Sequence, residues 1–386
     1  MKSQLSSLRS AAGDEKSANV HARLSKRETA MSAEDNNKRR EKRARERESG
    51  SFMAVDKLLP TSVIGSYSIP EWLERAKTDY LQRRIGGDQL QDMHDVAIKA
   101  AIKDQERAGI DIVTDGELRR DNDVDYFAYR IPGVEIDHRA KAYYYDFYDS
   151  VIRHKIPTAS LGLLPDFEFL KRNTDRPTKF TITGPFTLAK RIKNEFYPHE
   201  EEVALEFARL MNSELKALAK AGADYIQLDE SYLTGYPEDL TWVVRAINIA
   251  CEGVESHLIL HVCYGNRYGK PYWDGNYRFL FPGIFEAHIH QLALEFARKG
   301  DDDLEWFSKY PSELELGLGV IDVKNPQVET PAQVAERVRR ALKHVRPEKL
   351  YVNPDCGMHN LSSKTAFEKL SAMVQGTTIV REELSS

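Results

Sequence analysis

The chain has 386 residues, of which 41% are hydrophobic and 30% are charged, and it contains three cysteines. So few cysteines exclude a disulfide framework and favour a reducing compartment, which predicts a cytoplasmic protein. No stretch approaches the roughly 18 continuous apolar residues of a membrane span, and the first residues are too polar for a secretory signal.

The formal net charge of −5 is unevenly distributed along the chain. Residues 1–51 carry thirteen Lys or Arg against eight Asp or Glu and contain no Phe, Tyr or Trp. Such a segment buries too little apolar surface to fold alone. Residues 1–52 are therefore predicted to be a disordered basic leader, and residues 53–386 a single folded domain. A nucleic-acid-binding arm is the alternative for the leader, but the acidic remainder gives it no support, and we expect no nucleic-acid or membrane partner.

In chain order from residue 60, short β-branched runs alternate with helical stretches. Eight such runs are predicted strands: residues 61–66, 109–117, 179–185, 224–230, 258–265, 291–297, 316–322 and 349–357. Apolar strands separated by helices indicate a parallel sheet, and eight units predict an α/β protein with a closed (β/α)₈ TIM barrel. The alternative is an open doubly wound sheet, but no glycine-rich phosphate-binding motif follows any strand.

Amphipathic helices are predicted over residues 92–109, 200–222 and 330–345. The first two end at glycine, the expected stop signal. The third starts with Thr330 as N-cap and Pro331 as first helical residue. Two long connections, residues 128–178 and 265–280, are rich in aromatic residues. We expect them to cover one end of the barrel, with peripheral packing as the alternative for the first.

Polar residues cluster where the predicted strands end, which is where barrel enzymes build their sites. His261 and Cys263 are two residues apart on one strand, so both side chains point to the same face. Cys356 ends the eighth strand and Glu295 lies near the end of the sixth. Each residue alone has a plain structural explanation, such as a buried apolar role for Cys356. Together, two thiolates, an imidazole and a carboxylate suit Zn²⁺.

Two thiolate ligands fit a particular zinc chemistry. They reduce the Lewis acidity of the metal and make it a poor generator of hydroxide, but such a metal still binds a substrate thiol as thiolate near neutral pH. Alkyl transfer to a thiol is therefore the chemistry that these ligands favour.

Residues 60–375 resemble the catalytic barrel of cobalamin-independent methionine synthase. The matching motifs are VIGSY (63–67), DGELRRDNDVDYF (115–127), ITGPFTL (182–188), QLDE (227–230), HVCYGN (261–266), LEFA (294–297), GVIDVKNPQVET (319–330) and VNPDCG (352–357). The resemblance implies methyl transfer to zinc-bound homocysteine. It also implies that His261, Cys263, Glu295 and Cys356 hold the zinc, and that Glu295 yields when the substrate sulfur arrives.

The same resemblance implies how homocysteine is held at its other end. The backbone of Ile64, Gly65 and Ser66 would receive the carboxylate. Acidic side chains would receive the ammonium; the candidates are Glu117, Asp229 and Glu230. The structural alternatives are a salt bridge from Glu117 to Arg119 or Arg120, and a barrel-interior ion pair for Asp229 and Glu230.

The sequence departs from the family pattern on the side of the methyl donor. The full-length synthase carries an additional N-terminal barrel, whereas this chain has only the catalytic one. The segment AKRIKN (189–194) lacks the tryptophan that the family places against the folate ring. Lys324 stands where the family has a histidine credited with protonating the leaving group, and Lys324 with Asp322 is predicted to be catalytic. Methyltetrahydrofolate and a methylated corrinoid protein both stay open as donors.

Three functional hypotheses follow. The leading one is a zinc-dependent S-methyltransferase that forms methionine from homocysteine. The second keeps the zinc and the thiol but resembles the epoxyalkane–coenzyme M transferase, with Lys324 facing a sulfonate. The third is a non-catalytic barrel with structural zinc, since sites with four protein ligands are usually structural.

Overall fold

The computed structural model describes residues 55–142, 147–310 and 312–386, so the predicted leader at 1–52 lies outside the described residues. Residues from Ala54 to Ser386 form one compact unit. Within the described ranges, none of the helices combines the length and apolar character required to cross a membrane.

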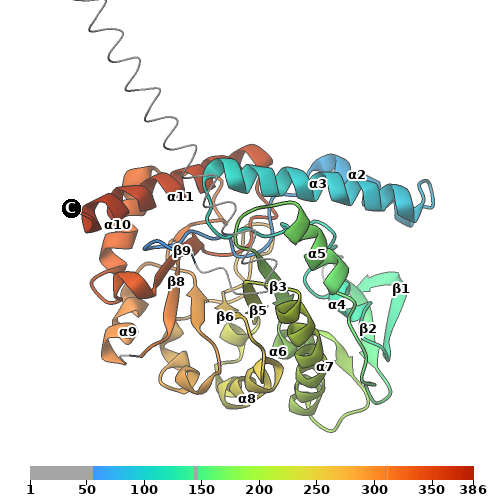
Figure 1. Ribbon diagram of the computed structural model, residues 1–386. Helices are drawn as coiled ribbons and strands as arrows, with labels where there is room; N and C mark the ends of the chain where they lie inside the picture. Colours follow the sequence, from blue (N-terminus) through green and yellow to red (C-terminus); the bar gives the residue numbers. More distant parts are fainter. Residues whose placement is uncertain (1–54, 143–146, 311) are drawn as a thin grey trace, which may run out of the picture. The chain divides into compact units, whose positions relative to one another are not determined.

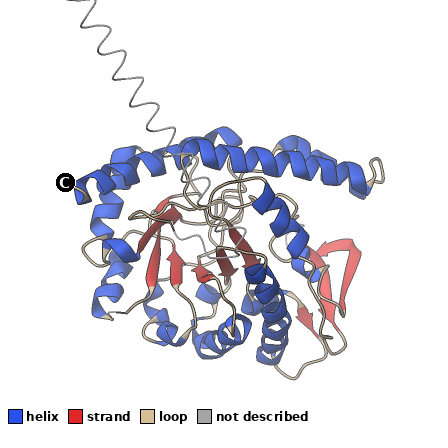
Figure 2. Cartoon of the chain, viewed as in Figure 1, coloured by secondary structure: helices blue, strands red, loops and turns tan. Residues whose placement is uncertain are grey.

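A six-stranded parallel sheet forms the centre of this unit (Figure 2). In spatial order its strands are β3 (Lys179–Thr183), β5 (Tyr225–Asp229), β6 (His257–Val262), β7 (Gln291–Leu294), β8 (Glu315–Ile321) and β9 (Leu350–Pro354). Each strand pairs in parallel with the next one. The helical segments that separate the strands in sequence supply the long connections that parallel pairing requires.

The first two predicted strands complete the ring through single parallel bridges. Thr61 bridges Val352 of β9, Ser62 bridges Ile112, and Val113 bridges Thr178 beside β3. The eight segments therefore form a closed parallel cycle, which is the order predicted for a (β/α)₈ barrel. Beside these bridges, the side chain of Asp111 accepts hydrogen bonds from both the backbone N–H and the hydroxyl of Thr61, each at 2.9 Å.

Helices surround the sheet (Figure 1). They are α2 (Glu71–Leu81), α3 (Gly87–Ala108), α4 (Asp125–Ala128), α5 (Leu164–Arg172), α6 (Pro185–Arg191), α7 (Glu200–Lys220), α8 (Leu240–Cys251), α9 (Glu305–Lys309), α10 (Pro331–Ala341) and α11 (Ser363–Leu384). Short 3₁₀ turns cover Leu233–Gly235, Pro237–Asp239, Tyr277–Leu280, Gly283–Glu286, Asp302–Leu304 and Pro347–Lys349.

The predicted helix boundaries are confirmed where their signals are local. Gly109 ends α3 in the left-handed conformation at φ 93°, which glycine adopts at little cost. The Thr330 side chain accepts a hydrogen bond from the backbone N–H of Gln333, and the Gln333 side chain accepts one from the backbone N–H of Thr330. This capping box starts α10 at Pro331, as the sequence predicts.

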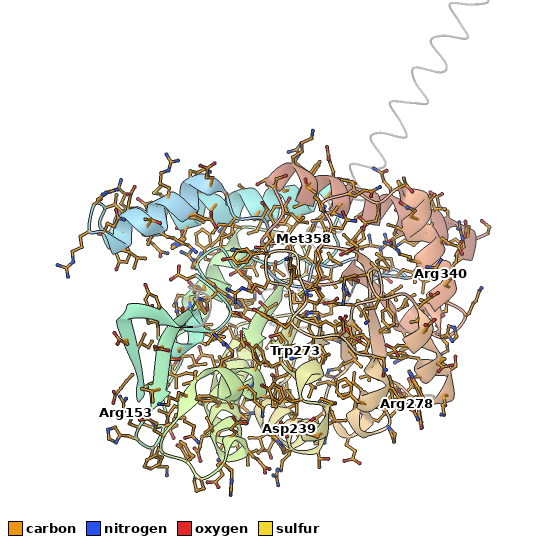
Figure 3. All side chains as sticks on the ribbon, turned by 180° about the vertical axis from the view of Figure 1, so that it is seen from behind. Arg153, Asp239, Trp273, Arg278, Arg340 and Met358 are labelled. Carbon is orange, nitrogen blue, oxygen red and sulfur yellow. The ribbon has the colours of Figure 1, made fainter. Side chains whose placement is uncertain are left out.

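The long connection at residues 128–178 contributes to a second, small sheet. Its strands are β1 (Val134–Ala142), β2 (Phe147–Ile152) and β4 (Lys193–Asn194). Arg153, at the edge of this sheet in Figure 3, pairs with Glu135 and Glu195. No described residue of 128–178 lines the cavity reported below, so peripheral packing, the alternative prediction, describes this segment.

Alternation along the strands divides the core into two parts. A large apolar cluster lies between strands and helices, while Ile64, Ile112, Tyr225, Ile259 and Ala293 form a separate small cluster. These five residues come from five segments of the ring, as expected of side chains that point into a barrel. Ile259 is two residues before His261, so the side chains of His261 and Cys263 lie on the same inward face.

Candidate metal centre

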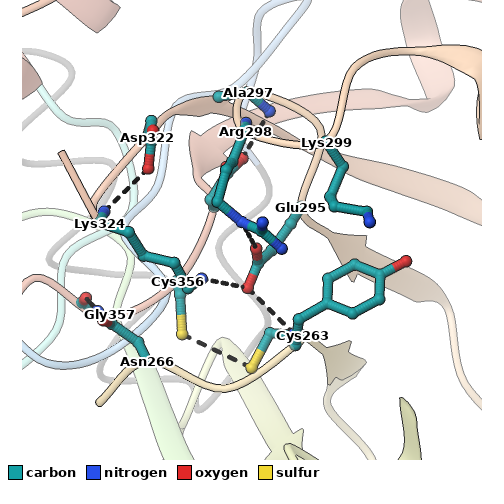
Figure 4. Close-up of polar contacts among 12 residues, drawn as sticks. Cys263, Asn266, Glu295, Ala297, Arg298, Lys299, Asp322, Lys324, Cys356 and Gly357 are labelled. Carbon is teal, nitrogen blue, oxygen red and sulfur yellow. Dashed lines mark hydrogen bonds and ion pairs between the residues drawn. The ribbon is translucent and has the colours of Figure 1, made fainter. Parts of the chain in front are cut away.

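His261, Cys263 and Cys356 converge at the carboxyl ends of β6 and β9. One ligand atom from each residue lies within 4.8 Å of the other two. The sulfur atoms of Cys263 and Cys356 are 3.6 Å apart (Figure 4). The structure therefore brings together three of the four metal ligands predicted from the sequence.

The His261 ring is oriented for ligation. Its Nδ1 atom lies 3.1 Å from the carbonyl oxygen of Ala293, which can only accept, so Nδ1 carries the proton. Its Nε2 atom is buried and has no hydrogen-bond partner among the described residues. A buried lone pair without a donor is what a metal would satisfy, and a carbonyl on the other nitrogen is the usual support for such a histidine.

The electrostatics of the three residues also favour a thiolate. A hydrogen bond from Cys263 lowers the pKa of the Cys356 thiol well below its ordinary value, against burial, and His261 and Lys324 act in the same direction. That hydrogen bond, together with burial, raises the pKa of Cys263. Burial would lower the pKa of His261, but the neighbouring Cys356 raises it. One nitrogen and two sulfurs of this kind fit Zn²⁺.

Glu295, the fourth predicted ligand, lies beside this group. It follows the last residue of β7 and is completely buried. Its Oε1 atom accepts hydrogen bonds from Lys324 Nζ at 2.7 Å and from the backbone N–H of Tyr264 at 3.1 Å. Glu295 does not belong to the converging group of ligand atoms.

Asp355, which was not a predicted site residue, fixes the turn that follows β7. Its carboxylate accepts hydrogen bonds from the backbone N–H groups of Phe296, Ala297 and Arg298 at 2.8–3.0 Å. Burial, with the nearby charge of Glu295, raises the pKa of Asp355 to about 7. Asp355 is the acidic residue of the PDCG motif, and its position at a strand end marked it as a polar residue near the site. Its hydrogen-bond partners could not be predicted, because they lie 57 to 59 residues away in sequence.

Lys324 and Asp322, the predicted catalytic residues, lie in the loop at residues 322–329, which we call the β8 loop. Asp322 Oδ1 accepts a hydrogen bond from the backbone N–H of Lys324 at 2.9 Å. Burial would lower the pKa of Lys324, but the charges of Cys356 and Glu295 raise it. Neither residue lines the cavity beside His261, Cys263 and Cys356 that is described below. The Lys324 side chain instead contacts Glu295.

A cavity of about 660 Å³ opens next to the three converging ligands. Its lining includes four of the predicted substrate residues: Ile64, Ser66, Glu117 and Asp229. Residues from the connection at 265–280 also line it: Gly265, Asn266, Arg267, Tyr268 and Tyr272. That second connection therefore lies at the cavity, as expected from the sequence.

Glu117 is held against the backbone at residue 65. Its Oε1 atom accepts a hydrogen bond from the Thr181 hydroxyl at 2.5 Å and lies 3.3 Å from Arg120. A Cβ atom on Gly65 would approach this oxygen to 2.2 Å, so only glycine leaves room for it. Glu117 also has a left-handed backbone, φ 59°, which is strained for a non-glycine residue and is common at functional sites. The salt-bridge alternative for Glu117 is present, and it coexists with a place at the cavity.

Asp229 and Glu230 are adjacent in sequence, but the Asp229 side chain lies at the cavity and the Glu230 side chain lies against α6. Asp229 accepts a hydrogen bond from Gln227 Nε2 at 2.6 Å, and burial raises its pKa to about 7. Glu230 does not line the cavity. Both of its oxygens accept hydrogen bonds from the first turn of α6, from the backbone of Phe186 and from the backbone and hydroxyl of Thr187. Its position gives no support to contact with substrate.

Comparison with known proteins shows the family of this chain. Residues 59–378 match the family model described as the catalytic domain of cobalamin-independent synthase. The chain is 39% identical over 331 residues to a methionine synthase of Saccharolobus islandicus, covering 85% of this chain and 96% of that protein. It is 36% identical over 332 residues to a methionine synthase of Sulfurisphaera tokodaii, covering 85% and 94%.

Among solved structures, a B12-independent methionine synthase from Shewanella sp. W3-18-1, determined in complex with selenomethionine, is similar with a TM-score of 0.75 and 30% identity. The match covers 85% of this chain and 99% of that one. The family match extends over most of the chain, and His261, Cys263 and Cys356 converge at the strand ends, so the protein belongs to the catalytic-domain family of cobalamin-independent methionine synthase and is a methyltransferase.

Proposed function

We propose that the chain acts in the cytoplasm as a zinc-dependent S-methyltransferase that forms methionine from homocysteine. The observation that carries this proposal is the group of His261, Cys263 and Cys356, which opens onto a cavity lined by acidic residues. Two thiolates and an imidazole would hold Zn²⁺, which supplies stabilisation of a bound thiol as thiolate near neutral pH.

The cavity offers complementary groups for the other end of an amino-acid thiol. Glu117 and Asp229 provide negative charge for an ammonium group. The backbone at residues 64–66 lies directly against Glu117, because Gly65 carries no side chain. A segment whose backbone N–H groups can donate to a carboxylate thus lies beside side chains that can accept from an ammonium group. This arrangement suits the carboxylate and ammonium groups that homocysteine carries on its α-carbon. We therefore assign Ile64, Gly65, Ser66, Glu117 and Asp229 to homocysteine and treat Glu230 as a residue that positions α6.

We assign the methyl donor to the part of the cavity that is lined by residues 265–268, Tyr272 and residues 359–362. Methyltetrahydrofolate and a methylated corrinoid protein are the two donors proposed. The cavity beside the ligands gives no support to a purely structural zinc, because structural sites are closed by protein.

The test is whether the zinc-loaded protein forms methionine from homocysteine, and mass spectrometry measures the methionine. Methyltetrahydrofolate, as monoglutamate and polyglutamate, and methylcobalamin are supplied in parallel. We expect methionine from one of these donors. If homocysteine binds to the metal and no methionine forms, a partner protein must supply the methyl group. If homocysteine does not bind, the proposal fails, and epoxide opening with another thiol becomes the reaction to test.

A further inference from the structure

Lys179, the first residue of β3, is a lysine buried against the neighbouring strand β5 (Figure 1). Its side chain is 2% exposed, and its Nζ atom donates a hydrogen bond to Gln227 Oε1 at 2.8 Å. Across the described ranges, no salt bridge to an acidic side chain accompanies this hydrogen bond. A buried ammonium group without a counter-ion lowers stability. The requirements of folding therefore do not explain Lys179.

Gln227 connects Lys179 to the groups that we assign to homocysteine. It lies two residues after Tyr225 on β5, so its side chain shares the inward face of the ring of strands. Its Nε2 atom donates to Asp229 Oδ1 at 2.6 Å and to the carbonyl oxygen of Ile64 at 3.0 Å. Asp229 is assigned to the ammonium group, and Ile64 begins the segment assigned to the carboxylate. One amide therefore joins both halves of the amino-acid end of the cavity.

The hydrogen bond from Lys179 determines which way this amide points. The oxygen and nitrogen atoms of an amide have nearly the same size, so their hydrogen-bond partners set the orientation. An ammonium group can only donate, and it therefore holds the oxygen of Gln227 toward itself. The Asp229 carboxylate and the Ile64 carbonyl can only accept, so both need the nitrogen. With the amide turned around, its oxygen would face two other oxygens and would repel them.

We propose that Lys179 is a positioning residue for the substrate: it fixes the orientation of Gln227 and so holds Asp229 where that carboxylate receives the substrate ammonium group. The inference rests on the proposed function in one respect, because the ammonium group is that of homocysteine. It makes Lys179 a determinant of specificity for amino-acid thiols over thiols that lack an ammonium group, although Lys179 itself does not line the cavity.

The test compares two thiols that differ only in the ammonium group, homocysteine and 4-mercaptobutanoate. Isothermal titration calorimetry measures the affinity of the zinc-loaded protein for each thiol. We expect the unaltered chain to prefer homocysteine, and Lys179→Met to bind homocysteine about tenfold more weakly, which is the scale of one hydrogen bond to a charged group. The affinities for 4-mercaptobutanoate and for Zn²⁺ should stay unchanged. Lys179→Met should fold, because an apolar side chain replaces a buried charge that has no counter-ion.

A double-mutant cycle shows whether Lys179 acts through Gln227. In the Gln227→Met background the amide is absent, so Lys179→Met should cause no further loss of homocysteine affinity. Gln291→Met is the matched control. Gln291 is a buried glutamine at the start of β7, and its Nε2 atom has no hydrogen-bond partner among the described residues. This variant should leave the affinities for both thiols unchanged.

Several results would overturn the inference. Tighter homocysteine binding by Lys179→Met would mean that the lysine charge repels the ammonium group. Equal weakening for both thiols would mean a general structural effect, and an equal loss in both backgrounds would mean that Lys179 acts without Gln227. The comparison of the two thiols on Lys179→Met decides the question even if Gln227→Met does not fold.

Failure of this inference is distinguishable from failure of the proposed function. If the unaltered chain does not bind homocysteine, the proposed function and the inference fail together. If it binds homocysteine and Lys179→Met leaves that affinity unchanged, the inference alone fails. Neither measurement requires a methyl donor.

Discussion

Glu230 lies at the end of β5 with no exposed surface, and its two oxygens accept three hydrogen bonds from the first turn of α6. A helix N-terminus favours negative charge, whereas burial disfavours it. Burial is the larger effect and raises the pKa of Glu230 to about 7, with the hydrogen bonds to Thr187 and Phe186 opposing it. Folding therefore takes up a proton at this residue around neutral pH.

Because Glu230 binds its proton more tightly in the folded chain, its contribution to stability is complete below about pH 4.5 and is lost as the pH rises through about 7. Glu230→Gln has no such titration. We expect the free energy of unfolding of the unaltered chain, relative to Glu230→Gln, to fall by up to about 3 kcal/mol between pH 5 and pH 8. Urea unfolding at four pH values measures this difference. A difference that grows with pH would show that the hydrogen bonds outweigh burial.

At the scale of elements, α11 braces the β8 loop through one buried lysine. Lys369 has no exposed surface, and its Nζ donates to the carbonyl of Asp322 at 3.0 Å, to the carbonyl of Gln327 and to Glu329 Oε2 at 2.8 Å. The loop that carries Lys324 is therefore fixed by the C-terminal helix.

Lys369→Met should destabilise the fold by about 3 kcal/mol, because Glu329 is left buried without its closest counter-ion. The double change Lys369→Met with Glu329→Gln should recover part of that loss. Lys364→Met is the control on the same helix, since its side chain is 83% exposed, and surface changes of this kind stay within about 0.5 kcal/mol. Urea unfolding of the four proteins checks the expectation, and equal stability of Lys369→Met and the control would contradict it.

Local signals in the sequence predicted much of this architecture. The alternation of apolar runs with helices placed β3 and β5–β9, and the Thr330–Pro331 pair placed the start of α10. The two-residue spacing of His261 and Cys263 predicted their common face, and the strand-end position of Cys356 brought it to the same group.

What the sequence did not predict depends on contacts between distant segments. The backbone N–H of Thr61 donates to the side chain of Asp111, 50 residues away. The partner of Lys324 is Glu295, 29 residues away, and the sequence did not predict this ion pair; the role of Lys324 toward the methyl donor stays a prediction. Glu230 has the composition of a site residue, yet α6 uses both of its oxygens. These partners are brought together by the closed ring of strands and cannot be recognised from neighbouring residues in the sequence.

At the scale of the whole described unit, the apolar core and the metal group occupy different places. The core runs from Leu59 to Val380 between the strands and the surrounding helices. The ring is closed by backbone bridges of Thr61, Ser62 and Val113, none of which is a metal ligand. Structure of this kind is stabilised mainly by burial of apolar area.

Removal of the metal should therefore leave the barrel folded. We expect Cys356→Ala to lose Zn²⁺ and methyl transfer while its circular dichroism spectrum matches that of the unaltered chain. One of three converging ligands is gone, whereas Cys356 is only partly buried at the edge of the core. Cys251→Ala is the matched control: Cys251 is buried in α8, away from the metal group, so its zinc content should stay at that of the unaltered protein. Metal content by atomic emission and circular dichroism before and after chelation are the measurements. Loss of helical signal on chelation would instead assign the zinc a structural role, because the barrel would then depend on the metal to stay folded.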